Sequence, residues 1–220
     1  MTRPVSEGDR APGQEADRPA EEGRRKPVHV RGEKVVLREK RLEDAPDDYA
    51  WRSDPELATY DAVAPLRLSL SDFMIIFREE LRYPSSRQMT LSIDDFEGRH
   101  IGNCMFYDIN ERRGSAELGI MIGDKDYWSQ GFGADVVRTL LRHIFASTPL
   151  TRVYLHTLSW NVRAQRSFKK AGFVPTSEVQ RNGQTFIAME VHKDQFLQGD
   201  AAHRGGQAEA DVPSRLAGEG

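Results

Sequence analysis

The chain has 220 residues and a formal net charge of −3, with 31 Lys and Arg against 34 Asp and Glu. This length accommodates one medium-sized domain, and the slightly acidic balance argues against a partner such as nucleic acid, whose phosphates need basic neutralisation. With Cys104 as the single cysteine and no Cys/His spacing typical of zinc, the sequence predicts neither an intramolecular disulfide nor a metal site.

The sequence predicts neither a membrane-spanning segment nor a secretory signal. No apolar run approaches the roughly 20 residues that span a bilayer, and the N-terminal charges are not followed by the apolar segment of a secretory signal. We therefore expect a cytoplasmic protein that does not bind membranes.

The two ends of the chain differ in composition from its middle. Residues 1–26 contain no aromatic residue and one large aliphatic residue, and residues 199–220 are rich in Gly, Ala and charge. Such segments bury too little apolar surface to offset the chain entropy of folding. The sequence thus predicts disordered tails at 1–26 and 199–220 around a single domain at 27–198.

The first half of this domain alternates between the two kinds of periodicity. A β-rich run at 34–38 predicts a strand, and helix formers at 43–52 predict a helix that ends before Asp54-Pro55. A serine N-cap followed by apolar residues at helical spacing predicts a second helix over 69–81. Three strands then follow through short connections, which favours an antiparallel meander: 89–93, 101–109 and 115–122.

The second half begins with a helical apolar stripe from Val137 to Phe145. A strand at 153–158 and a helix from Val162 to Gly172 follow, and an Asn-Gly pair at 182–183 predicts a final hairpin. The element order βααβββαβαββ predicts an α/β (α+β) fold. We expect a mixed, mostly antiparallel sheet of about seven strands with helices on both faces.

Two segments carry signals of chemistry. The stretch 123–138, GDKDYWSQGFGADVVR, joins a strand to a helix with Gly131 and Gly133 at the junction. The unpaired N–H groups and positive dipole end of a helix suit a pyrophosphate, and glycines let it approach. Taken alone, two glycines are more typical of a tight turn, and Asn161, at the next strand-to-helix junction, is more typical of an N-cap.

Together, in this order and at this spacing, the two segments resemble the GNAT superfamily of acyl-CoA N-acyltransferases. The strand 117–122 and the following YWSQGFG are similar to that family's pantetheine strand and pyrophosphate loop, and the stretch from Asn161 to Phe173 is similar to its next motif. The opening VVLREKRLEDA and the Asn-Gly hairpin resemble the ribosomal-protein N-terminal acetyltransferase (RimJ/RimL-like) branch. The resemblance covers roughly residues 30–195.

The resemblance implies an acetyl-CoA-dependent N-acetyltransferase, with acetyl-CoA as co-substrate and no metal. It implies two splayed central strands, 117–122 and 153–158, with the thioester in the gap between them. The residues that it places against acetyl-CoA are Ile120, Met121, Ile122, Trp128, Ser129, Gln130, Gly131, Phe132, Gly133, Ala134 and Asn161.

The partner implied is an acceptor that carries a primary amine: a protein N-terminus, a polyamine, an amino sugar or an aminoglycoside. The loop at 60–68 is expected to line the acceptor site, where Asp61 would attract a cation. An acyl-CoA-binding module without turnover is the alternative function. Homodimers are common in the branch, so a homodimer is the candidate assembly.

At the expected catalytic site, two positions depart from the family pattern. Many relatives have a Tyr general acid where this chain has Phe168, and some have a Ser where it has Ala164; neither residue here donates a proton. Glu117, mid-strand beside the expected thioester, is the candidate general base, and His156 on the adjacent strand is the second candidate. A cross-strand pair or another structural role is the alternative for both.

Overall fold

The structure is a computed structural model that describes residues 27–210, with side chains up to His203. The strands are β1 (His29–Arg31), β2 (Val36–Glu39), β3 (Met89–Asp94), β4 (His100–Asn110), β5 (Ser115–Ile122), β6 (Arg152–Leu158), β7 (Val174–Arg181) and β8 (Gln184–His192). The helices are α1 (Ala45–Ser53), α2 (Pro55–Tyr60), α3 (Leu70–Arg82), α4 (Phe132–Ser147), α5 (Val162–Lys170) and α6 (Lys193–Ala210), with short 3-10 turns η1 (Leu42–Asp44) and η2 (Lys125–Tyr127).

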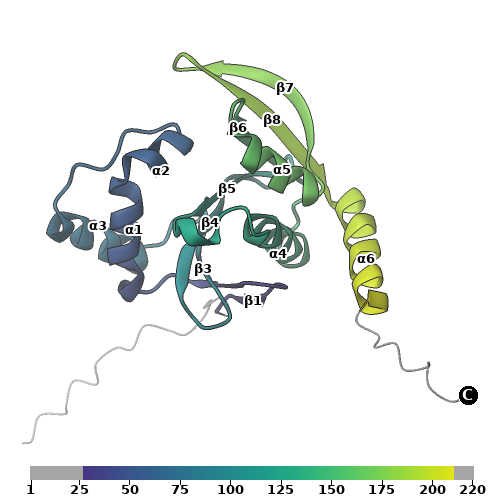
Figure 1. Cartoon of the computed structure of the whole chain (residues 1–220), viewed down its shortest axis with the longest axis horizontal. Coiled ribbons are helices and arrows are strands. Elements are labelled where there is room, and N and C mark those ends of the chain that lie inside the picture. The colour runs from purple at the N-terminus through teal and green to yellow at the C-terminus, as the bar shows by residue number, and fades with distance from the viewer. Residues whose placement is uncertain (1–26, 211–220) are drawn as a thin grey trace, which may run out of the picture.

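The strands form one sheet in the order β1-β2-β3-β4-β5-β6-β8-β7. All neighbours are antiparallel except β5 and β6, which are parallel. The mixed, mostly antiparallel fold is as predicted, with an eighth strand because the short β1 pairs with β2. Figure 1 shows α1, α2 and α3 grouped at the left, the β7–β8 hairpin across the top and α6 at the right.

The parallel pair at the centre is short. Hydrogen-bonded partners run only from Ser115 opposite Arg152 to Glu117 opposite Tyr154. Beyond this point β5 continues to Ile122 without pairing with β6, so the two strands part. The splayed centre that the family resemblance implied is therefore present.

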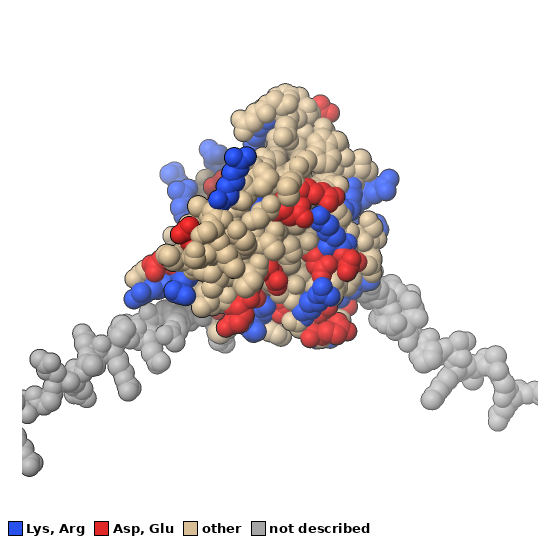
Figure 2. Space-filling model, turned by 60° about the vertical axis from the view of Figure 1, so that its left-hand side comes forward, with Lys and Arg blue, Asp and Glu red and all other residues tan. Residues whose placement is uncertain are grey.

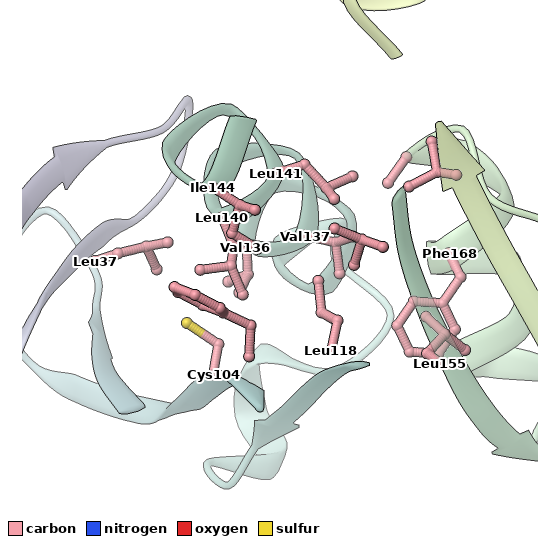
Figure 3. Close-up of a cluster of buried hydrophobic side chains, with 14 of the residues drawn as sticks. Leu37, Cys104, Leu118, Val136, Val137, Leu140, Leu141, Ile144, Leu155 and Phe168 are labelled. Carbon is pink, nitrogen blue, oxygen red and sulfur yellow. The ribbon is translucent and has the colours of Figure 1, made fainter. Parts of the chain in front are cut away.

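One face of the sheet is apolar and is covered by α4 and α5. Leu140, Leu141 and Ile144 of α4 are fully buried, and their apolar stripe packs against the strands (Figure 3). Leu118 and Leu155 contribute from the two central strands. Burying such side chains is worth roughly 1.5–3 kcal/mol each, so this layer provides the main hydrophobic core.

The opposite face is polar where η1 and α1 cover it. The guanidinium of Arg38 is buried between Asp44, at 2.8 Å, and Asp94, at 2.6 Å. Burial opposes the charge on Asp44, but hydrogen bonds from Arg38 and Ser92 outweigh this and lower the pKa of the carboxyl group. The cluster joins η1 to β2 and β3 through charge-assisted hydrogen bonds.

Two helices differ from the sequence prediction. The first predicted helix does end before Asp54-Pro55, but Pro55 opens a further helix, α2, because proline is favoured at a first helical position. Asp54 caps α2 by accepting from the backbone N–H of Glu56 at 2.7 Å.

The predicted C-terminal tail at 199–220 is wrong for its first part, because α6 continues to Ala210. The composition of a segment indicates whether it can form a hydrophobic core by itself. Helix α6 does not need to, because it packs against the core formed by the rest of the domain. Phe196 lies against Phe145, and Asp200 accepts from Arg142 at 2.8 Å. The predicted tail at 1–26 and the last ten residues lie outside the described residues.

The surface agrees with the modest net charge. On the face shown in Figure 2, basic and acidic side chains are interspersed and form no large field of one sign. Within the described range, no helix is both long and apolar enough to cross a membrane. The same range contains no group of three or more His, Cys, Asp or Glu side chains placed to hold a metal ion.

Candidate active site

A cavity of about 660 Å³ opens where β5 and β6 part, and we call it the α4–α5 cavity. The end of β5, the glycine loop, the first turns of α4 and α5, and the end of α2 form its walls. Nine of the residues predicted to bind the cofactor line it: Ile120, Met121, Ile122, Trp128, Ser129, Gly131, Gly133, Ala134 and Asn161.

Two predicted cofactor residues do not line the cavity. The Gln130 side chain donates to the carbonyl of Asp126. The Phe132 ring packs edge-on against Tyr127, with centroids 4.9 Å apart. Their side chains therefore support the shape of the loop, and only their peptide groups remain available to a ligand.

The glycine loop ends on a residue that has to be glycine. Gly131 is the N-cap of α4 and has φ +89°, a left-handed conformation that side chains rarely adopt. Its geometry presents the first turn of α4 to the cavity, where the N–H groups and helix dipole favour an anion. The sequence prediction of an anion site at this junction agrees with this geometry.

The cavity is also lined by more cations than anions. Arg163, Arg166 and Lys170 of α5 line it, against a single carboxylate, that of Asp61. These cations, together with the α4 N-terminus, fit a ligand with several phosphate charges. The residues present therefore fit acetyl-CoA, whose pyrophosphate would meet the α4 turn.

The β5 backbone beside the gap offers peptide groups to a ligand. The N–H of Gly123 donates to Ile101 at 2.9 Å on the β4 side. Because peptide groups alternate along a strand, those of Ile120 and Ile122 point toward the gap. The Ile122 carbonyl is already occupied by the Trp128 indole N–H at 2.7 Å, so the N–H of Ile122 and both groups of Ile120 remain.

Asn161 is an N-cap, as the more conservative interpretation of the sequence proposed. Its Oδ1 accepts from the backbone N–H of Ala164 at 3.1 Å. The side chain is nearly buried and lines the α4–α5 cavity. Its Nδ2 group is the remaining donor, so capping α5 and binding a ligand are compatible.

An aromatic wall at the cavity mouth was not anticipated from the sequence. The Arg163 guanidinium lies 3.5 Å from the ring centroid of Trp128 and 4.8 Å from that of Tyr60. Tyr60 also packs against Trp160 at 5.3 Å. Of the loop predicted to bind the acceptor, only Tyr60 and Asp61 reach this cavity.

Glu117 and His156, the two candidate bases, are partners. His156 Nδ1 lies 2.8 Å from Glu117 Oε1, and Arg181 Nη2 lies 3.0 Å from His156 Nε2. Guanidinium groups only donate, so Nε2 is the acceptor and the proton of a neutral imidazole is on Nδ1. His156 therefore donates to Glu117, and Arg181 fixes that tautomer.

Two tyrosines surround the same carboxylate. Burial and the neighbouring Glu117 raise the pKa of Tyr107, and the same two causes raise the pKa of Tyr154. Both phenols therefore stay protonated near neutral pH. Their hydroxyl groups make the surroundings of the Glu117 carboxylate polar at the point where β5 and β6 separate.

The position where the family pattern has a tyrosine general acid holds no proton donor in this chain. Phe168 and Ala164 both line the α4–α5 cavity, as expected, and neither carries a proton to give. The α5 residue that brings a hydroxyl group to this cavity is Ser167, and its hydroxyl donates to the Arg163 carbonyl at 3.3 Å.

Comparison with known proteins agrees with this geometry. Residues 34–174 match the model of the acetyltransferase (GNAT) domain. Over 148 residues, the chain is 29% identical to the uncharacterized N-acetyltransferase p20 of Bacillus licheniformis, an alignment that covers 64% of this chain and 83% of that protein.

Solved structures show the same fold at low identity. Spermidine N-acetyltransferase from Vibrio cholerae, in complex with CoA and spermine, matches with a TM-score of 0.66 at 19% identity, over 74% of this chain and 98% of that one. Aminoglycoside acetyltransferase AAC(6')-Ib in complex with coenzyme A matches with a TM-score of 0.63 at 18% identity, over 74% and 98%.

Proposed function

The chain belongs to the GNAT family of acetyltransferases, and we propose that it transfers the acetyl group of acetyl-CoA to a primary amine by direct attack on the thioester. One observation supports this most: the α4–α5 cavity is lined by the end of β5, and Glu117 is the last residue of β5 that pairs with β6 before the strands part. A site for the acyl donor and a group that accepts a proton thus share one gap.

Acetyl-CoA supplies an activated acetyl carbon and a thiolate leaving group. The first turn of α4, with Arg163 and Arg166 opposite, would hold the phosphates. The peptide groups of Ile120 and the N–H of Ile122 would bind the pantetheine arm as an added strand does. Asn161 Nδ2 would donate to the same arm while its Oδ1 caps α5.

Glu117 is the general base in this proposal. An alkylammonium acceptor must lose a proton before its nitrogen can attack, and a carboxylate at the strand separation can accept it directly or through water. His156 acts as a positioning residue, because its Nδ1–H holds Glu117 and its Nε2 is occupied by Arg181. The thiolate would leave with help from backbone N–H groups and water.

Membership of the family indicates an acceptor that carries an amine, and several kinds of amine are candidates. Candidate acceptors are a protein N-terminus, a polyamine, an amino sugar and an aminoglycoside, and the solved relatives named above are enzymes for spermidine and for aminoglycosides. Assignment to the RimJ/RimL-like branch, and a homodimer, are further parts of the proposal that rest on the sequence resemblance.

The test is release of free thiol from acetyl-CoA in the presence of a panel of amines. We expect thiol release that depends on both the protein and an amine. Calorimetric binding of acetyl-CoA without thiol release from any amine would instead support the alternative, an acyl-CoA-binding module without turnover.

A further inference from the structure

A second cavity, of about 520 Å³, lies on the opposite face of the sheet from α4 and α5, and we call it the β6 cavity. The end of β4, β6, β7 and Arg87 from the α3–β3 loop form its walls. His156 and Tyr154 are among its lining residues, so its inner end adjoins the Glu117–His156 pair. Neither the family match nor the sequence pattern assigns a ligand to it.

Two carboxylates lie in or beside the β6 cavity. Glu117 lies behind His156, and Asp108 lines the cavity. Asp108 has φ +49° at a β-bulge in β4, a strained conformation of the kind that collects at functional sites. Burial, Glu117 and Asp108 together raise the pKa of Tyr154, so Asp108 lies near that phenol.

The β6 cavity also carries positive charge that is not neutralised. Arg87 and Arg113 line it, and neither has an ion-pair partner within the described residues. Arg152 also lines the cavity, but Glu190 neutralises it at 2.7 Å and its guanidinium lies 5.0 Å from the centroid of the Tyr154 ring. Two positive charges without an ion-pair partner therefore line the same cavity as Asp108.

We infer that the acceptor is a small amine that also carries a carboxylate or a phosphate, and that it binds in the β6 cavity. This inference rests on the proposed N-acetyltransferase function. The ammonium would lie beside Glu117 and Asp108, and the anion would pair with Arg87 and Arg113. A polyamine would instead bring a second ammonium against these arginines, which is unfavourable.

The spacing indicates how far apart the two charges of the ligand are. Ser115, at the cavity wall, is two residues from Glu117, or about 7 Å along a strand. Arg113 lies beyond it on the β4–β5 turn. Probes with about three to five carbons between the ammonium and the anion cover this separation.

The experiment compares amines that differ only at the far end. The anionic probes are 4-aminobutyrate and 6-aminohexanoate. Each is compared with its alkylamine (butylamine or hexylamine) and with its diamine (1,4-diaminobutane or 1,6-diaminohexane). A further probe, 3-aminopropyl phosphate, distinguishes phosphate from carboxylate. Thiol release gives kcat/KM for each. We expect the anionic members to exceed their alkyl and diamine counterparts by about tenfold or more, the effect of one charge-assisted bond.

Two neighbouring arginines give a matched control. Arg113→Gln should reduce the advantage of 6-aminohexanoate over hexylamine by about tenfold, mainly through KM. Arg112→Gln, on the same exposed turn but outside the cavity lining, should leave that advantage as it is. Turnover that favours the diamines, or an equal effect of the two substitutions, would overturn the inference alone. Acetyl-CoA binding without thiol release from any probe would overturn the proposed function, and this inference with it.

Discussion

The α4–α5 cavity and the β6 cavity offer different chemical groups to a ligand. The α4–α5 cavity presents backbone groups, in the first turn of α4 after Gly131 and at the end of β5, together with the cations of α5. The β6 cavity presents side chains, charged ones of both signs among them, from five strands, the β4–β5 turn and the α3–β3 loop. Backbone donors suit a ligand that is always the same, such as the phosphates of a co-substrate. Side chains suit the part that selects an acceptor and moves its proton.

If this division is correct, substitutions on the two sides of the gap should affect different kinetic quantities. Changes in the α4–α5 cavity should alter the dissociation constant of acetyl-CoA. Changes around Glu117 should alter turnover and leave that constant unchanged. Binding and turnover have therefore to be measured on the same samples.

Glu117→Gln should produce the largest change. The substitution keeps size and a hydrogen-bonding group but removes the base, so kcat should fall by ~10²–10⁴-fold at neutral pH. Calorimetry should show unchanged affinity for acetyl-CoA. Glu178→Gln, at an exposed position of β7, is the matched control and should be fully active. A destabilised but fully active Glu117→Gln protein would make Glu117 a structural residue and contradict the division.

Gly131→Val should act on the other cavity. Valine cannot readily adopt φ +89°, so the first turn of α4 would shift away from its position toward the phosphates. Loss of two charge-assisted bonds would weaken acetyl-CoA binding by ~10²-fold or more. Gly183→Val is the control, because Gly183 has φ +74° in the β7–β8 turn, outside both cavities. Equal affinities for the two variants would show that the loop does not bind the phosphates.

His156 should give the smallest of the three effects, because it positions the base. His156→Ala removes the N–H donor that holds the Glu117 carboxylate in place. We expect kcat to fall by about tenfold, well below the loss expected for a general base. His156→Gln, which keeps an N–H donor, should restore much of the rate, and His192→Ala is the control. Equal rates for His156→Gln and His156→Ala would contradict a positioning role.

The sequence predicted the α4–α5 cavity well because its parts are local. A strand, a glycine junction and a helix follow one another within 117–138, and each is recognisable by its own periodicity or turn chemistry. Even Asn161, which lies farther along the chain, is placed by its own strand-to-helix junction.

The β6 cavity could not be predicted in the same way. Arg87, Asp108 and Val179 line it from distant parts of the chain, and only the pairing of the strands brings them together, which no local pattern encodes. The buried pair of Arg38 and Asp44 has the same origin, since charged residues are normally assigned to the surface. Helix α6 was missed because its stability comes from contacts with α4.

The central claim, that Glu117 takes the proton of the acceptor amine, is tested most directly by comparing wild type and Glu117→Gln across pH. Turnover is measured by thiol release from about pH 7 to 10 with an alkylamine whose pKa is about 10.4, as for a lysine side chain. As pH rises, more of the amine is already neutral and needs no base. The account predicts that the variant gains rate more steeply with pH, so that the gap between the two proteins narrows toward pH 10. Parallel profiles, separated by the same factor at every pH, would contradict it.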